Sequence, residues 1–141
     1  TFGNDGCCNL NGQTYVMWVF ADGNGFSKCG DYKGTGNANG RFIYCGFKPA
    51  WVMIKRADSD GEYWNMADNK RQDDDNPADK FLYADRDEGE GTKTTGIDFV
   101  SNGFKIRGTD GAMNNSSGNY CYMAFAAEPV VASNGTPATA G

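Results

Sequence analysis

Histidine is absent from this 141-residue chain. Without an imidazole, the chain has no means of building a Ser-His-Asp or Cys-His nucleophilic site or a histidine-ligated metal centre. A phosphate-binding loop is lacking as well, because the glycine-rich run at residues 34–40 is not followed by the Lys-Ser/Thr pair that opens a helix. The sequence therefore predicts a protein without catalytic residues, which is not an enzyme.

Excess basic charge and long apolar runs are lacking too. The chain has 13 Lys and Arg against 18 Asp and Glu, a net charge of −5. An acidic chain is repelled by phosphate backbones and by anionic lipid headgroups, so nucleic acid is not an expected partner. No apolar run approaches the roughly 18 residues that a membrane helix needs, so membrane insertion is not expected either.

Glycine and aromatic residues, in contrast, are abundant. Twenty glycines in 141 residues is about twice the average usage and indicates many tight turns. Short runs rich in β-branched and aromatic residues alternate with these turns. We expect strands at 14–21, 41–47, 50–56, 62–66, 80–84, 96–100, 103–107 and 119–127. The pattern predicts an all-β, antiparallel β-sandwich, with a jelly-roll or lectin-like arrangement as one option.

The chain also matches itself at an offset of 105 residues. Residues 3–9 align without gaps on 108–114, and 15–21 align on 120–126. Identities fall at Gly3/Gly108, Asp5/Asp110, Gly6/Gly111, Asn9/Asn114, Tyr15/Tyr120, Phe20/Phe125 and Ala21/Ala126. Since this period is the size of a whole sandwich domain, the simplest interpretation is tandem domains.

The tandem interpretation divides the chain into three parts. Residues 1–22 are the terminal strand of a preceding repeat, 26–128 are a complete repeat, and 129–141 are a small-residue tail or linker. The alternative is a single domain with two similar edge strands, in which 1–22 supplies the first strand.

Five cysteines form an odd and irregular set with no CxxC pair. Such a set is a poor disulfide framework, so we expect buried free thiols that act as small hydrophobic side chains. Cys29 and Cys45 both lie near expected strands, and they are the pair to test first for a disulfide.

Acidic residues offer the one candidate metal site. Asp58, Asp60 and Glu62 alternate around a glycine, and hard oxygen ligands at such spacing bind Ca²⁺. The twelve-residue loop that ends in glutamate is missing, and a charged run is commonly a solvated face. Apart from calcium at these three residues, no cofactor is expected.

Aromatic residues offer the candidate contact surface. Tyr63 and Trp64 lie in a short strand with polar flanks, and together with Tyr83 they are the residues expected to contact a sugar or another surface. Trp18 and Trp51 lie inside apolar runs and are expected in the core.

Four longer strings, at residues 46–56, 80–92, 96–107 and 118–129, resemble a repeated domain of bacteriophage tail and fibre-like proteins. The resemblance implies a virion or extracellular location and a structural or adhesive role in an appendage such as a tail fibre, spike or capsid fibre. It also implies a homo-oligomer whose partners are other virion proteins and a host-surface glycan. No catalytic residue is carried over from that family.

Three other functions are compatible with the same residues. The first is a carbohydrate-binding module that stacks aromatic rings on sugars. The second is a glycosidase or depolymerase, which needs two carboxylates held across a cleft. The third is a self-assembling extracellular filament subunit, in which residues 1–22 complete a neighbour's sheet by strand addition.

Overall fold

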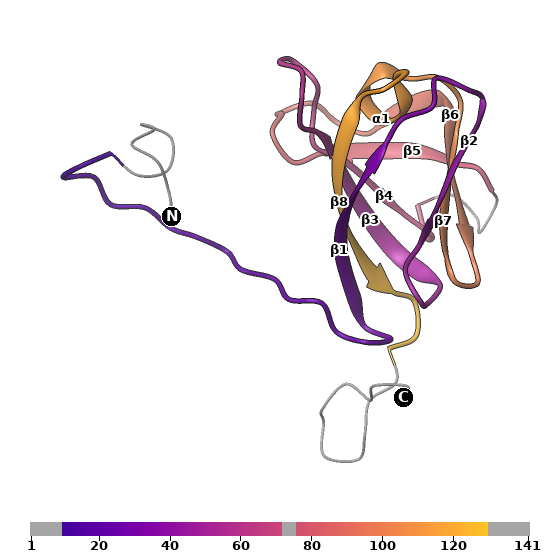
Figure 1. Cartoon of the computed structure of the whole chain (residues 1–141), viewed down its shortest axis with the longest axis horizontal. Coiled ribbons are helices and arrows are strands. Elements are labelled where there is room, and N and C mark those ends of the chain that lie inside the picture. The colour runs from indigo at the N-terminus through magenta and orange to yellow at the C-terminus, as the bar shows by residue number, and fades with distance from the viewer. Residues whose placement is uncertain (1–9, 72–75, 130–141) are drawn as a thin grey trace, which may run out of the picture.

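The computed structural model of this chain describes residues 10–71 and 76–129, which hold eight strands and one short helix (Figure 1). The elements are β1 (Ser27–Lys33), β2 (Asn39–Tyr44), β3 (Pro49–Arg56), β4 (Asn65–Asp68), β5 (Ala78–Tyr83), β6 (Gly91–Val100), β7 (Gly103–Arg107), α1 (Gly111–Asn114) and β8 (Asn119–Ala126). The predicted all-β class is confirmed. Cys7, Cys8 and the tail at 130–141 lie outside the described residues.

All eight strands belong to one antiparallel sheet in the order β1-β8-β3-β4-β5-β6-β7-β2. β5 pairs with β4 on one side and with β6 on the other, and so joins the two halves of the sheet. The sheet curls into a nearly closed barrel, with β1 and β2 as its two ends (Figure 1). Within the described ranges, no helix combines the length and the apolar character needed to span a membrane.

The core fills the barrel interior with alternate side chains of the strands. The largest fully buried apolar side chains include Val52, Ile54, Phe81, Ile97, Phe104, Ile106, Met113 and Tyr120. Tyr120 stacks on Tyr32 of β1, with ring centroids 5.0 Å apart. Because β8 lies between β1 and β3, its inward side chains reach the centre of this core.

The loop and helix before β8 fix that strand with buried hydrogen bonds. Asn114 is fully buried, and its carboxamide bonds to Thr35 N, Asn37 O and Gly108 O at 2.7–2.8 Å. The Tyr120 hydroxyl donates to Gly111 O and accepts from the backbone N–H of Asn115, both at 2.7 Å. Residues 108–126, here called the α1–β8 unit, therefore dock as one piece on β1, β3 and the β1–β2 loop.

A tight turn at Ser101-Asn102 joins β6 and β7, and Gly103 follows it. None of these residues adopts a positive φ, and Gly103 is already the first residue of β7, paired with Val100. A Cβ on Gly103 would lie 2.0 Å from the carbonyl oxygen of Ile43 in β2. Close approach of β2, and not turn geometry, excludes a side chain at this position.

Two strand assignments from the sequence are wrong. Residues 14–21 form no strand of this sheet, although their composition predicts one. Residues 27–33 form β1, although the run SKCGDYK has few β-branched or aromatic residues. β1 forms because β8 pairs with it along its whole length, so tertiary context overrides a weak local preference.

Candidate functional site

The most exposed apolar segment of the described chain is Thr14–Ala21, here called the arm. It is extended and runs away from the barrel toward the N-terminus (Figure 1). Val16, Trp18 and Val19 are 81%, 82% and 76% exposed. A contiguous apolar segment in water marks an interaction surface in a soluble protein. The expectation that Trp18 is a core residue is therefore wrong.

The root of the arm, residues 21–23, is held on β1 by hydrogen bonds. Gly23 and Ser27 exchange two backbone hydrogen bonds of 2.9 and 3.0 Å, and the Ser27 hydroxyl donates to Ala21 O at 2.8 Å. Asp22 accepts from the backbone N–H of Cys29 at 2.7 Å and pairs with Lys28. The Lys28 and Cys29 hydrogen bonds hold the pKa of the Asp22 carboxyl below its usual range. The arm therefore leaves the barrel from a fixed point.

The outer face of the β1-β8-β3-β4 sheet carries an apolar patch, although outer faces of antiparallel sheets are commonly polar. Cys29, Met123, Met53 and Met66 lie side by side in one cross-strand row. Phe125 and Trp51 pair in the next row, with ring centroids 5.7 Å apart. These six residues, all partly exposed, are here called the outer apolar face.

The arm and the outer apolar face meet at the root of the arm. Phe20 of the arm contacts Phe125 edge to face, with ring centroids 6.0 Å apart. Beside this contact, Trp18, Phe20, Met53, Trp64 and Met123 line a shallow hollow of about 260 Å³. The two features thus form one continuous apolar surface. Its side chains can bind another apolar surface.

The outer apolar face was missed by the sequence analysis, although β8 carries a signal for it. One set of alternate residues in β8, Tyr120, Tyr122 and Ala124, is buried in the barrel. The other set, Cys121, Met123 and Phe125, is apolar as well. A strand that is apolar on both faces indicates that both faces are covered in some state of the protein.

The three aromatic residues predicted to make surface contacts do not form one platform. Tyr63 and Tyr83 touch edge to face, with centroids 5.7 Å apart, whereas Trp64 lines the hollow beside the arm. The Arg86 guanidinium lies 3.8 Å from the centre of the Tyr63 ring. One face of Tyr63 is therefore already occupied by a cation–π contact.

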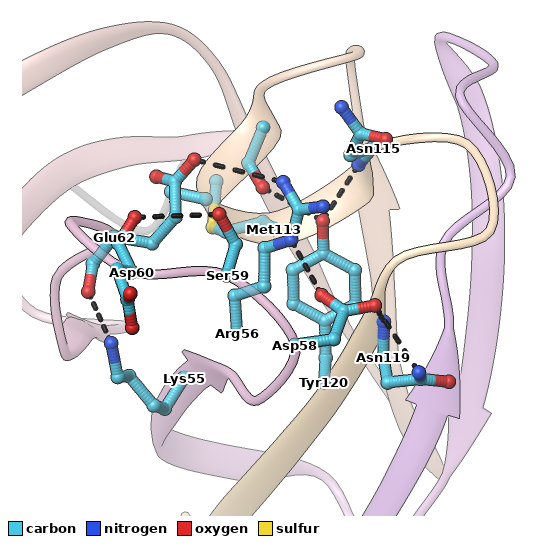
Figure 2. Close-up of polar contacts among 12 residues, drawn as sticks. Lys55, Arg56, Asp58, Ser59, Asp60, Glu62, Met113, Asn115, Asn119 and Tyr120 are labelled. Carbon is cyan, nitrogen blue, oxygen red and sulfur yellow. Dashed lines mark hydrogen bonds and ion pairs between the residues drawn. The ribbon is translucent and has the colours of Figure 1, made fainter.

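The predicted calcium residues lie in the loop after β3, where Arg56 occupies the space between two of them (Figure 2). Arg56 donates to Asp58 at 2.8 Å and lies 3.8 Å from a carboxylate oxygen of Glu62. Asp58 also accepts from Asn119 N at 2.8 Å. The Arg56 and Asn119 hydrogen bonds lower the pKa of the Asp58 carboxyl.

This arrangement is an ion-pair network in which arginine supplies the positive charge. Asp60 is exposed, and neither its carboxylate nor that of Glu62 converges with Asp58 on a common point. Over residues 10–71 and 76–129, no three acidic or thiol side chains gather as a metal-binding group would. Calcium at this loop stays a prediction without support from the geometry.

The proposed Cys29–Cys45 disulfide is not formed, and both thiols are free. Cys29 belongs to the outer apolar face of β1, whereas the Cys45 side chain is buried just after β2. Burial raises the pKa of the Cys45 thiol to about 11. The expectation of a buried free thiol holds for Cys45 but not for Cys121, which is exposed.

Comparison with known proteins identifies a family for this chain but does not indicate an activity. A family model described as a domain of unknown function (DUF7483) matches residues 1–129, and so spans the arm as well as the barrel. No curated protein and no solved structure gives a significant match.

Proposed function

We propose that this chain, which belongs to the family described as a domain of unknown function (DUF7483), is a structural and adhesive module of a bacteriophage virion appendage. The barrel would act as a rigid body, and the arm would join it to other protein chains. Other copies of the chain and other virion proteins would be its partners, in a virion or extracellular location.

The observation that carries this proposal is the arm itself. Three of its apolar side chains are more than three-quarters exposed, while its root is fixed to β1. Burying a side chain of this kind contributes about 1.5–3 kcal/mol. Burial of the arm's apolar side chains by a partner protein would therefore have a large favourable free energy. A segment that connects subunits requires such a contribution.

A carbohydrate-binding role is less well supported by the same geometry. Stacking on sugars needs an open, flat aromatic face, and Arg86 covers one face of Tyr63. Trp64 lies apart from Tyr63 and Tyr83, in the hollow beside the arm. We therefore prefer protein surfaces over glycans as the partners of this chain.

We also propose that the chain is not catalytic. Asp58, Asp98 and Asp110 are each bonded to a cationic side chain, at 2.8, 2.6 and 2.7 Å respectively. Carboxylates held in ion pairs stabilise the loops and strands around them and are poorly suited to donate a proton to a substrate.

The location of the protein tests the proposal directly. Antibodies raised against the purified chain are applied to the lysate of the producing cells, separated on a density gradient and examined by immunogold electron microscopy. We expect the chain to sediment with phage particles and the gold to mark an appendage. A chain found only in the soluble fraction, with unlabelled particles, would refute the virion role.

A further inference from the structure

We propose that the arm is a donor strand that takes the β8 position in a second copy of this domain. The inference rests on the proposed assembly role and names the partner of the arm. Its starting point is a correspondence of residues: Thr14–Ala21 lies over Asn119–Ala126 at the offset of 105 residues.

The inward face of the arm matches the inward face of β8. Tyr120, Tyr122 and Ala124 are 1%, 8% and 0% exposed in the barrel. The arm presents Tyr15, Met17 and Val19 at the corresponding positions. A one-residue slip would exchange the two faces of a strand, so this agreement also sets the register of the donated strand.

The outer face agrees as well. Val16, Trp18 and Phe20 correspond to Cys121, Met123 and Phe125 of β8. In the barrel, Met123 and Phe125 belong to the outer apolar face and pack beside Met53 and Trp51 of β3. The β8 position therefore offers apolar neighbours on both faces, and the arm is apolar on both faces.

The sequence before the arm retains the polar residues of the α1–β8 unit. Asp5, Asn9 and Tyr15 correspond to Asp110, Asn114 and Tyr120. In the barrel, Asp110 caps α1 by accepting from Ala112 N, Asn114 bonds to the β1–β2 loop, and Tyr120 bonds to Gly111 and Asn115. Tyr15 already reproduces one of these bonds, because its hydroxyl accepts from Leu10 N at 3.0 Å as that of Tyr120 accepts from Asn115 N. The Asn114 carboxamide and the Asp110 carboxylate, in contrast, reach Thr35, Asn37 and Lys93 in other elements, which points to the same fold as the partner.

In every copy of this chain the β8 position is filled by that copy's own β8, so the arm takes it only where that strand is displaced. β8 already pairs along β1 on one edge and along β3 on the other. The root of the arm lies on the edge of β1 that faces away from β8. On that edge, Ser27 and Cys29 bond to Gly23 and Asp22. Phe26 O and Gly34 N, in contrast, bond on the β8 side. The arm therefore leaves on the side of β1 that is opposite to its own β8.

A matched pair of substitutions in the full chain separates donor from acceptor. Ala124→Asp places a charge at a fully buried site of β8, which disfavours the chain's own strand and opens the position. Val19→Asp is the equivalent change in the arm. Ser101→Asp, in an exposed turn, is the control for an added charge. Circular dichroism and light scattering after size exclusion report folding and mass.

We expect Ala124→Asp to stay folded and to form head-to-tail oligomers, because each arm fills the open position of the next chain. Val19→Asp alone should be a folded monomer, and combining it with Ala124→Asp should abolish folding. Ser101→Asp added to Ala124→Asp should leave the oligomers unchanged.

Two outcomes would overturn the proposal. If Ala124→Asp is as unfolded as the double variant, the arm does not replace β8. If it is a folded monomer, no second copy is involved. The test is independent of location: oligomers from a chain absent from virions would retain the strand exchange and refute only the virion role.

Discussion

β8 and the arm share an apolar sequence pattern, with identities at Tyr15/Tyr120, Phe20/Phe125 and Ala21/Ala126, but they have opposite environments. β8 is paired on both edges and fills the centre of the barrel, whereas the arm forms no strand and exposes its apolar side chains to solvent. Both segments carry a tyrosine at the first inward position and a Phe-Ala pair near the end.

The difference shows that a strand needs an acceptor as well as a suitable sequence. β8 gains its hydrogen bonds from β1 and β3, and its docking is completed by Asn114 and Tyr120. The arm has the side chains of a central strand but forms no ladder, and the described residues before β1 pair with that strand only at the Gly23–Ser27 bridge beside the root of the arm. Packing on neighbouring strands, and not intrinsic preference, decides whether such a segment is ordered in a sheet.

The largest effect should come from truncating the equivalent tyrosines. Tyr120→Ala removes a fully buried ring and its two hydrogen bonds, so we expect a loss of about 3–5 kcal/mol in the free energy of unfolding. Tyr15→Ala should change it by less than about 1 kcal/mol, because Tyr15 is 40% exposed. Urea unfolding measures both, and equal losses would show that the arm belongs to the folded core.

Thiol reactivity distinguishes the outer face of β8 from the barrel interior. At pH 7.5, Cys121 should be alkylated by iodoacetamide well before Cys45, whose pKa is raised to about 11 by burial. Peptide mapping by mass spectrometry assigns each thiol. Faster modification of Cys45 than of Cys121 would contradict the placement of these two residues.

Because the pKa of Cys45 is raised in the folded state, this thiol contributes to stability fully below its ordinary pKa of 9.0. The contribution is lost as the pH rises from 9.0 through about 11, where the unfolded chain releases the proton first. The Cys45→Ala variant should therefore lose less stability than the parent between pH 8 and pH 11.

The smallest effect should come from Asp58, which fastens the first residue of β8 and has no counterpart at the arm. Its pKa is lowered by Arg56 and Asn119, so its contribution is present above the ordinary value of 3.8 and is lost as the pH falls below that value. Asp58→Asn should produce a small decrease in melting temperature at pH 7, and no decrease near pH 2. A decrease that persists at pH 2 would assign another role to this side chain.

The sequence predicted most of the sheet because seven of the eight strands carry their own local signal. β3, β7 and β8 are rich in apolar and aromatic residues, and turn residues flank them. β1 was missed because its order comes from β8, which lies about 90 residues further along the chain. The arm was predicted as a strand because composition does not reveal whether an acceptor edge is available.

The candidate site was harder to predict, since it depends on which residues converge. The spacing of Asp58, Asp60 and Glu62 suggested calcium, but Arg56 lies between two of these carboxylates. Tyr63 and Trp64 are adjacent in the chain and serve different surfaces. The internal repeat was the one sequence feature that led to the arm, because it marked residues 14–21 as a second β8.

Hydrogen exchange in the full chain tests the central claim most directly, namely that the same strand pattern is ordered only where an acceptor is present. Under dilute, monomeric conditions, the backbone amides of residues 16–20 should exchange at rates close to those of an unstructured peptide. The amides of residues 120–124 should exchange only through global unfolding. Equal protection of the two segments in the monomer would contradict the account, because the arm would then already be paired within its own chain.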